Sequence, residues 1–415
     1  MGQALTGDPR AARAGEGTLV LTGATGFVGM ALLERWLERT SDHVIAPVRA
    51  ICDAQAQERI DAVLNGLFGE RAVEHRPRVR ALAADLAAPG LGLEARVRDG
   101  IAERATTIIH AAASVAFSLA LHRARAINVE GTRRMLELAR CAQERGALRH
   151  YAQISTAYVA GTHPGSFCED DHDVGQRFHN SYERSKFEAE LLVREHTGLP
   201  SSIIRPSIVV GDRQTGWTAA FNVLYWPLRA LSRGLFPAIP ARADSPLDVV
   251  SIDYVADAIV ELVLRHPGAG ATHHLTAGPL GSSIGELAAL ASAYFGVALP
   301  EMVDPEHFAR LPLSPAQREA LAAGAEYFPY FCIDTTFEDR ATRARLAGTG
   351  IRVDPLRDYL PTLLDFATAS RWGKRPITRA QALAWGGARI RAAALARRSR
   401  PGAAMPQALA VGAAR

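Results

Sequence analysis

Cysteine is scarce in this chain of 415 residues, and long hydrophobic runs are missing. The four cysteines, Cys52, Cys141, Cys168 and Cys332, are scattered without a CxxC pair. This spacing argues against a disulfide scaffold or a thiolate metal site and favours a reducing, cytoplasmic setting. No apolar run approaches the roughly 20 residues of a membrane span, and no charged segment followed by an apolar core opens the chain. We therefore expect no membrane association.

Lysine is almost absent as well. Of the 47 basic residues only Lys186 and Lys374 are lysines, so arginine carries nearly all of the positive charge. A lysine that persists against such a bias is a candidate for a role as an amine. The formal net charge of +4 is modest, and we expect no nucleic-acid partner, although a basic surplus suits phosphate-rich or acidic partners.

The rest of the composition, with 48% hydrophobic and 22% charged residues, is ordinary for a globular protein. From Thr18, short apolar runs alternate with amphipathic stretches, which is typical of a parallel sheet with helical crossovers. The predicted fold class is therefore α/β, a Rossmann-type doubly wound sheet with a smaller, mainly helical C-terminal region. The expected strands are 18–22, 43–48, 78–84, 106–112, 149–155, 201–206 and 272–278.

The first expected strand runs directly into a glycine-rich turn. Residues 18–30 read TLVLTGATGFVGM, with glycines spaced GxxGxxG. Between a strand and a helix, such glycines permit a tight turn, the approach of a pyrophosphate and close helix packing, and the helix N-terminus supplies N–H donors. The alternative is a simple tight turn. The residues expected to bind a dinucleotide are Gly23, Thr25, Gly26, Phe27, Val28 and Gly29.

The end of the second strand indicates which dinucleotide is bound. An NAD enzyme usually has Asp or Glu there, about 20 residues after the glycines, to bind the ribose hydroxyl. Here the strand ends on Arg49, and Arg59 follows one or two helical turns later. A guanidinium suits the 2′-phosphate of NADP, although both residues could be ordinary surface arginines. Asp85, beside Leu86 after the third strand, could bind the adenine amino group or cap a helix.

We divide the chain on this pattern into a flexible tail (1–15) and an NADP-binding Rossmann domain (16–278) that contains a substrate-side insertion (212–250). A mainly helical substrate region (279–372) follows. The last part (373–415) is rich in alanine and arginine, and we expect a helix that frays into a basic tail.

Tyr182 and Lys186 are four residues apart in an expected helix and therefore share one face. A phenol has an ordinary pKa of about 10, which a nearby ammonium lowers. The lysine can also reach the ribose of the nicotinamide. After the fifth strand, the hydroxyl of Thr156, or alternatively that of Ser155, can donate a hydrogen bond to an oxyanion. We predict Thr156, Tyr182 and Lys186 as the catalytic residues.

Together these motifs resemble the extended short-chain dehydrogenase/reductase superfamily. The markers are TGATGFVG, HAAA (110–113), INVEGT (127–132), ISTAYV (154–159) and the YxxxK pair. Further details, such as RPSIVVGD (205–212), are similar to the branch of thioester reductases and fatty acyl-CoA reductases, the male-sterility type. AEYFPYFCIDTTF (325–337) resembles the C-terminal part of acyl reductases.

This resemblance implies roles for further residues. Asn128 would be the structural or proton-relay asparagine of the superfamily. The residues implied along the cofactor are His110, Ala111, Ala112, Ala113, Pro206, Ser207 and Ile208.

The resemblance also implies a reaction. NADPH would deliver hydride to the carbonyl carbon of an acyl thioester, while Tyr182 protonates the oxygen and Thr156 stabilises it. Collapse of the hemithioacetal would release the thiol of CoA or of an acyl carrier protein and leave an aldehyde, and a second hydride could then give an alcohol. Nothing in the sequence resembles an adenylation domain, so the thioester would arrive preformed. By analogy we expect a homodimer.

Two alternatives remain open at this level. Trp217, Phe221 and Tyr225 recur every four residues, and they either line an acyl channel or pack in the core. The same fold could also serve an NAD(P)-dependent hydroxysteroid-type or sugar-nucleotide dehydrogenase or epimerase. Sugar-nucleotide enzymes usually prefer NAD, so Arg49 argues against them. A non-catalytic NADP sensor commonly lacks the Tyr/Lys pair that is present here.

Overall fold

The computed structural model describes residues 17–221, 223–266 and 270–398. Its central feature is a seven-stranded, fully parallel sheet with the order β12-β7-β5-β4-β1-β2-β3. The strands are β1 (Thr18–Thr22), β2 (His43–Val48), β3 (Val79–Ala83), β4 (Thr107–His110), β5 (His150–Ile154), β7 (Ser201–Pro206) and β12 (Ala271–Leu275). Each matches a strand expected from the sequence, and the predicted α/β fold is confirmed.

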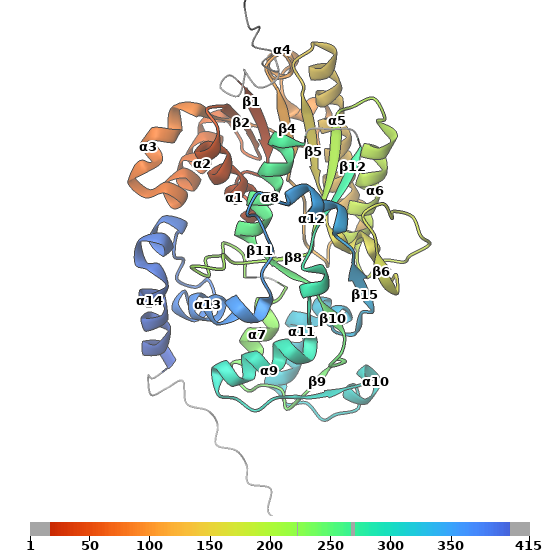
Figure 1. Ribbon diagram of the computed structural model, residues 1–415, viewed down its shortest axis with the longest axis vertical. Coiled ribbons are helices and arrows are strands. Elements are labelled where there is room, and N and C mark those ends of the chain that lie inside the picture. Colours follow the sequence, from red (N-terminus) through yellow and green to blue (C-terminus); the bar gives the residue numbers. More distant parts are fainter. Residues whose placement is uncertain (1–16, 222, 267–269, 399–415) are drawn as a thin grey trace, which may run out of the picture.

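Helices cover both faces of this sheet (Figure 1). Successive residues of β1 point to opposite faces, so that Leu19 and Leu21 join one buried cluster and Val20 joins another. The first cluster takes in α1 (Phe27–Arg39), α2 (Asp53–Phe68) and α8 (Ile252–Arg265). The second takes in α4 (Ala95–Ala102), α5 (Leu121–Glu144) and α6 (Ser181–Glu195).

A smaller lobe is built from two segments that are distant in the sequence. Its buried cluster joins Leu228 of α7, Leu287 of α9 and Leu363 of α13. The expected insertion and the C-terminal region therefore share one core (Figure 1). The helices of the lobe are α7 (Tyr225–Leu231), α9 (Ile284–Phe295), α10 (Pro305–Phe308), α11 (Pro315–Gly324) and α13 (Leu356–Ala369).

Short strand pairs connect the remaining segments. They are β6 (Gly165–Phe167) with β15 (Thr335–Phe337), β8 (Ile208–Val210) with β11 (Val249–Ser251), β9 (Ala238–Pro240) with β14 (Glu301–Val303), and β10 (Pro246–Leu247) with β13 (Ser282–Ser283). The remaining α-helices are α3 (Ala72–His75), α12 (Arg340–Leu346) and α14 (Arg379–Arg398). The β6–β15 pair brings the C-terminal region back onto the Rossmann half.

The two ends of the chain were expected to be tails. Residues 1–15 lie outside the described residues. Within 373–415, the segment up to residue 398 is described, and α14 packs there against α2 and α13. Ala382 and Ile390 of α14 are buried in the same cluster as the first face of the sheet. This part of the segment is a packed helix with a kink at Gly386.

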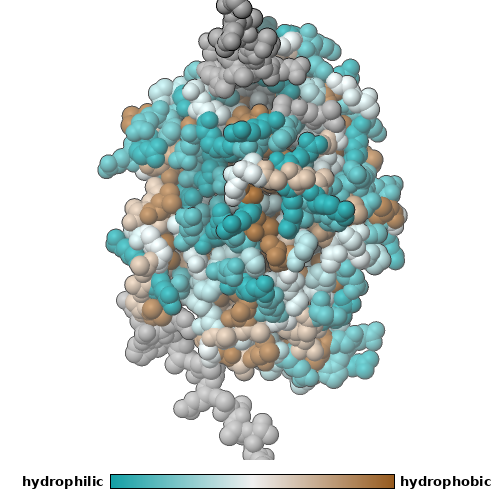
Figure 2. All heavy atoms as spheres, in the orientation of Figure 1, coloured by the Kyte–Doolittle hydropathy of each residue, from teal (hydrophilic) through white to brown (hydrophobic). Residues whose placement is uncertain are grey.

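Hydrophilic residues cover much of the face shown in Figure 2, and apolar side chains reach that surface in separate small groups. Large exposed apolar side chains such as Ile51, Val73, Val115 and Leu299 belong to different segments. Across the described ranges, no helix combines the length and the apolar character needed to cross a bilayer.

Candidate active site

A cleft of about 1300 Å³, counting space open to solvent, lies at the carboxyl ends of β1, β4, β5 and β7. The strand order reverses between β1 and β4, and open α/β sheets bind ligands at such a point. The predicted site residues that line the cleft are Gly23, Gly26, Phe27, Val28, Gly29, Ala111, Ala113, Thr156, Tyr182, Lys186, Pro206, Ser207 and Ile208. Ser155, the alternative to Thr156, lines it as well.

The glycine turn shapes one wall of the cleft. Gly23 has a φ of 77°, and its carbonyl accepts a hydrogen bond from the Gly26 N–H at 2.8 Å. A Cβ atom at Gly29 would lie 2.0 Å from the Gly23 carbonyl oxygen, so only glycine allows α1 to start this close to β1. The helix begins without a side-chain cap or an acidic residue in its first turn. Its first N–H groups therefore suit an anion, and the turn fits a dinucleotide pyrophosphate.

Arg49 and Arg59 lie close together beyond this wall. Both side chains are exposed, and the Arg59 guanidinium donates to the Arg49 carbonyl oxygen. Asp85 is exposed too, and its Oδ1 accepts from the Ala87 N–H at 3.0 Å, so it closes a local turn. None of these three lines the cleft, and neither do Thr25 and Leu86.

The end of β4 and the segment that follows it contact the hydroxyl of Thr22 in β1. His110 is buried, and its Nδ1 lies 2.7 Å from the Thr22 hydroxyl. The oxygen of that hydroxyl accepts a hydrogen bond from the Ala112 N–H. Burial, assisted by the charge of Lys186, lowers the pKa of His110 to about 3. The His110 side chain and Ala112 do not line the cleft as the resemblance implied, because both contact the Thr22 hydroxyl, whereas Ala111 and Ala113 line the cleft.

Asn128 is a buried residue of α5 that ties this segment to α6. Its Oδ1 accepts from the Ser114 N–H at 2.8 Å. Its Nδ2 donates to the Ser114 carbonyl at 3.0 Å and to the Ser185 hydroxyl at 2.9 Å. Asn128 is outside the cleft, and this geometry favours the structural one of the two roles expected for it.

Thr156, Tyr182 and Lys186 converge on the far wall. The Thr156 Oγ1 accepts a hydrogen bond from the Tyr158 N–H at 3.2 Å, and the Thr156 side chain lies near enough to the Tyr182 phenol to influence its pKa. Burial raises the pKa of Tyr182 to about 12, against the opposing effect of Thr156. The Lys186 Nζ donates to the Ile154 carbonyl at 2.6 Å, and burial lowers its pKa to about 8, opposed by Glu190. A phenol and an amine thus face one cleft beside the end of β5.

The start of α6 is fixed by the C-terminal lobe. Asn180 caps the helix, since its Oδ1 accepts from the Glu183 N–H at 3.0 Å, and its Nδ2 donates to the Tyr330 hydroxyl at 2.7 Å. The Tyr330 hydroxyl in turn donates to the buried Glu183 carboxylate. Tyr330 belongs to a 3-10 helix over Ala325–Cys332. Tyr330 therefore fixes the first turn of α6 through hydrogen bonds to a residue before Tyr182 and a residue after it.

Other residues that line the cleft were not predicted as site residues. They include Phe117, which stacks on Tyr182 at 5.7 Å between ring centroids, together with Tyr158, Val223 and Tyr330. Tyr158 lies inside the ISTAYV motif, and Tyr330 lies in the aromatic stretch 325–337. These two motifs were the only hints in the sequence that Tyr158 and Tyr330 belong to the site. The positions of the four residues along the chain do not predict that they meet at one cleft.

The three regularly spaced aromatics pack in the core instead of lining an acyl channel. Trp217 is buried against Phe27, with 5.6 Å between ring centroids. The Tyr225 hydroxyl accepts from the Gly211 N–H at 3.0 Å, and Phe221 packs on Tyr225 at 5.2 Å. None of the three lines this cleft, and the burial of Trp217 and Tyr225 favours the core-packing alternative.

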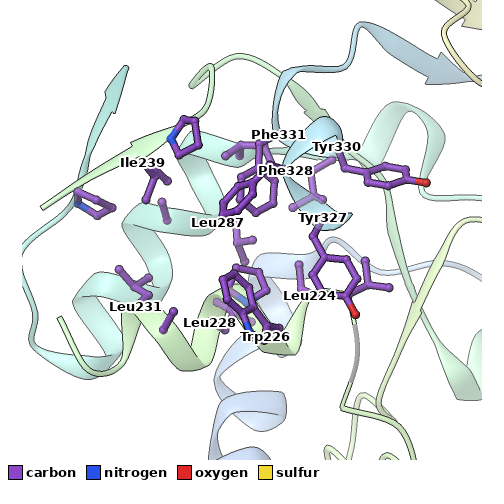
Figure 3. Close-up of a pocket in the computed structure, with 18 of the residues that line it drawn as sticks. Leu224, Trp226, Leu228, Leu231, Ile239, Leu287, Tyr327, Phe328, Tyr330 and Phe331 are labelled. Carbon is purple, nitrogen blue, oxygen red and sulfur yellow. The ribbon is translucent and has the colours of Figure 1, made fainter. Parts of the chain in front are cut away.

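A second cavity opens beside the cleft, and it is lined by neighbours of those aromatics (Figure 3). Leu224, Trp226 and Leu228 line it, whereas Tyr225 does not. The two hollows share Tyr158, Ile208, Val223 and Tyr330. The cleft and the second cavity therefore adjoin one another at these four residues.

Comparisons with known proteins agree with this geometry. The NAD-binding family model described as "Male sterility protein" matches residues 21–259. The isonitrile lipopeptide synthase of Streptomyces coeruleorubidus is 33% identical over 279 residues, which are 65% of this chain and 18% of that protein. The fatty acyl-CoA reductase wat of Drosophila melanogaster is 27% identical over 271 residues, which are 58% of this chain and 52% of that protein. The chain thus spans about a fifth to a half of these curated relatives.

Among solved structures, the terminal R domain from the myxalamid PKS-NRPS biosynthetic pathway superimposes with a TM-score of 0.72 at 26% identity. The match covers 88% of this chain and 95% of that domain. The similarity therefore extends beyond the Rossmann half into the C-terminal lobe.

Proposed function

This chain belongs to the male-sterility, thioester-reductase family of the extended short-chain dehydrogenases/reductases, and we propose on that premise that it is an NADPH-dependent reductase of acyl thioesters. The observation that carries the proposal is the convergence of Thr156, Tyr182 and Lys186 opposite the glycine turn of one cleft. The apolar cavity that adjoins the cleft supports an acyl substrate. The thiol carrier would be CoA or an acyl carrier protein.

Three polar side chains of the cleft have a task in this reaction. The bound dinucleotide supplies the hydride that reduces the thioester carbonyl. Thr156, oriented by the Tyr158 N–H, would hold the carbonyl oxygen, and Tyr182 would give that oxygen its proton. The Lys186 ammonium would make the phenol more acidic and hold the ribose hydroxyls. Loss of the thiol would then leave an aldehyde as the product, or an alcohol where a second hydride follows.

The direct test follows NADPH absorbance with a series of acyl thioesters and identifies the products by mass spectrometry. Tyr182→Phe should lower kcat by roughly 10²–10⁴-fold, because it removes the proton donor, and should leave NADPH affinity nearly intact. Wild-type turnover in this variant would show that Tyr182 is not the acid. If no thioester is reduced, alcohols with NADP test the hydroxysteroid-type alternative.

The preference for NADPH is assigned to Arg49, with Arg59 beside it. In the described part of the chain the Arg49 guanidinium has no carboxylate partner, which leaves it available to a phosphate. Arg49→Ala should weaken NADPH binding by about tenfold or more, the effect of one charge-assisted hydrogen bond, and should leave NADH binding nearly unchanged. Titration of both cofactors by fluorescence measures this, and an equal loss for the two would contradict the assignment.

A further inference from the structure

The second cavity has a lining of one chemical kind. About 80 Å³ of it is open to the centre of a water-sized sphere, within about 980 Å³ of unfilled space that includes solvent, and every residue that lines it is apolar or aromatic. The walls come from α7, from α9 and from the segment 325–333, and they include Trp226, Leu228, Leu287, Phe328 and Phe331 (Figure 3). A charged group placed here would lose its hydration and find no ionic partner in the walls.

The cavity adjoins the cleft that holds Thr156, Tyr182 and Lys186. Tyr158, Ile208, Val223 and Tyr330 form the shared neck between the two hollows. Figure 3 shows Tyr330 at the edge of the cavity with its hydroxyl pointing away from the aliphatic side chains. That hydroxyl is bound to Asn180 and Glu183, so the neck presents the Tyr330 ring and no free polar group of this residue.

We infer that this cavity holds the acyl chain, and that the substrate class is an uncharged, fatty-acid-like acyl group long enough to pass the neck. The inference rests on the proposed thioester reductase function. A short acyl group would stay in the cleft and gain nothing from the cavity. An acyl group with a distal carboxylate or ammonium would be rejected, because the lining offers it no counterion.

The test uses the purified full chain, NADPH and a series of S-acyl pantetheines from acetyl through octanoyl to hexadecanoyl. Pantetheine is the part that CoA and carrier proteins share, so the series does not depend on the carrier. We expect kcat/KM to rise about three- to fourfold per methylene until the cavity is filled, which corresponds to about 0.8 kcal/mol for each buried CH₂. A dodecanoyl chain with a terminal carboxylate should be at least about a hundredfold poorer than dodecanoyl itself.

Two neighbouring alanines of α9 provide a matched pair of variants. Ala288 lines the cavity, and Ala289 is exposed on the same helix. Ala288→Phe should lower kcat/KM for the dodecanoyl thioester by about tenfold or more through loss of buried chain, and should lower it several-fold less for the acetyl thioester. Ala289→Phe should change neither.

The outcomes separate the inference from the proposed function. Reduction with no dependence on chain length, or equal reduction of the carboxylate-bearing chain, would overturn the inference and leave the reductase intact. Calorimetric titration with S-dodecyl pantetheine, a thioether that cannot be reduced, reports on the cavity alone. If it binds, and Ala288→Phe abolishes that binding, while no thioester is reduced, the cavity assignment stands and the proposed function fails.

Discussion

At the scale of single residues, the buried amine of Lys186 changes its charge close to neutral pH. Burial lowers its pKa to about 8, whereas an unfolded lysine has a pKa of about 10.4. Between these values the unfolded chain binds the proton and the folded protein does not. The contribution of Lys186 to stability therefore rises with pH through this window and is least favourable below it.

This difference can be measured by urea unfolding of the wild type and of Lys186→Met. Because the variant has no titrating amine, the wild type should gain about 2 kcal/mol relative to it between about pH 7.5 and about pH 9.5. Comparing the two proteins cancels the other groups that titrate in this range. A constant difference across the window would mean that Lys186 keeps its ordinary pKa in the folded protein.

At the scale of elements, the β1–α1 turn contains glycines that differ in what they permit. A Cβ atom at Gly29 would lie 2.0 Å from the carbonyl oxygen and 2.5 Å from the carbonyl carbon of Gly23, and neither atom can move without moving the strand. At Gly26 the nearest atom would be 3.3 Å away, and the backbone there, with φ −91° and ψ 166°, suits any residue. Gly29 is therefore required for packing, while Gly26 faces the cleft.

The two alanine substitutions should separate these roles. Gly29→Ala should lower the free energy of unfolding by about 1–3 kcal/mol, as overpacking does, even without cofactor. Gly26→Ala should keep the stability within about 1 kcal/mol and weaken NADPH binding, because its methyl group occupies the path of the pyrophosphate. Thermal unfolding and cofactor titration measure the two effects. Tight NADPH binding by Gly26→Ala would contradict the proposed approach of the pyrophosphate.

At the scale of the whole molecule, one buried arginine connects three distant segments. Arg379, at the start of α14, donates to Glu34 of α1 at 3.2 Å and pairs with Asp212 at 2.9 Å. Its guanidinium also lies over the Trp217 ring. Burial alone would raise the pKa of Asp212, but Arg379 and Thr215 outweigh it, so the pKa lies below its ordinary value. The packing of α14 on the Rossmann half depends on this junction.

Arg379→Ala should therefore be costly. It leaves the Asp212 carboxylate buried without its cation and removes one of the two arginines beside Glu34, and breaking such a buried pair typically costs about 3–5 kcal/mol. The exposed Arg375 is the control, and Arg375→Ala should stay within about 0.5 kcal/mol of the wild type. Urea unfolding measures both variants, and similar values for the two would show that the junction contributes little.

Local rules were enough for the parallel sheet, the glycine turn and the Tyr182–Lys186 spacing. Strand period, turn chemistry and the i, i+4 relation each act within a few residues, so the sequence by itself determined that these features occur and in what order. The same rules did not fix the environment of Trp217, Phe221 and Tyr225. Periodicity says which side chains share a face, but it does not say what covers that face.

Only the tertiary structure decided which residues meet at the cleft and its adjoining cavity. Tyr330 reaches Glu183 across 147 positions of the chain, and Leu287 of α9 joins Leu228 of α7 in one wall. Asn128 and His110 likewise gained their partners from other elements. Contacts of this kind form because separate apolar faces must bury one another, and that choice depends on the packing of the whole chain.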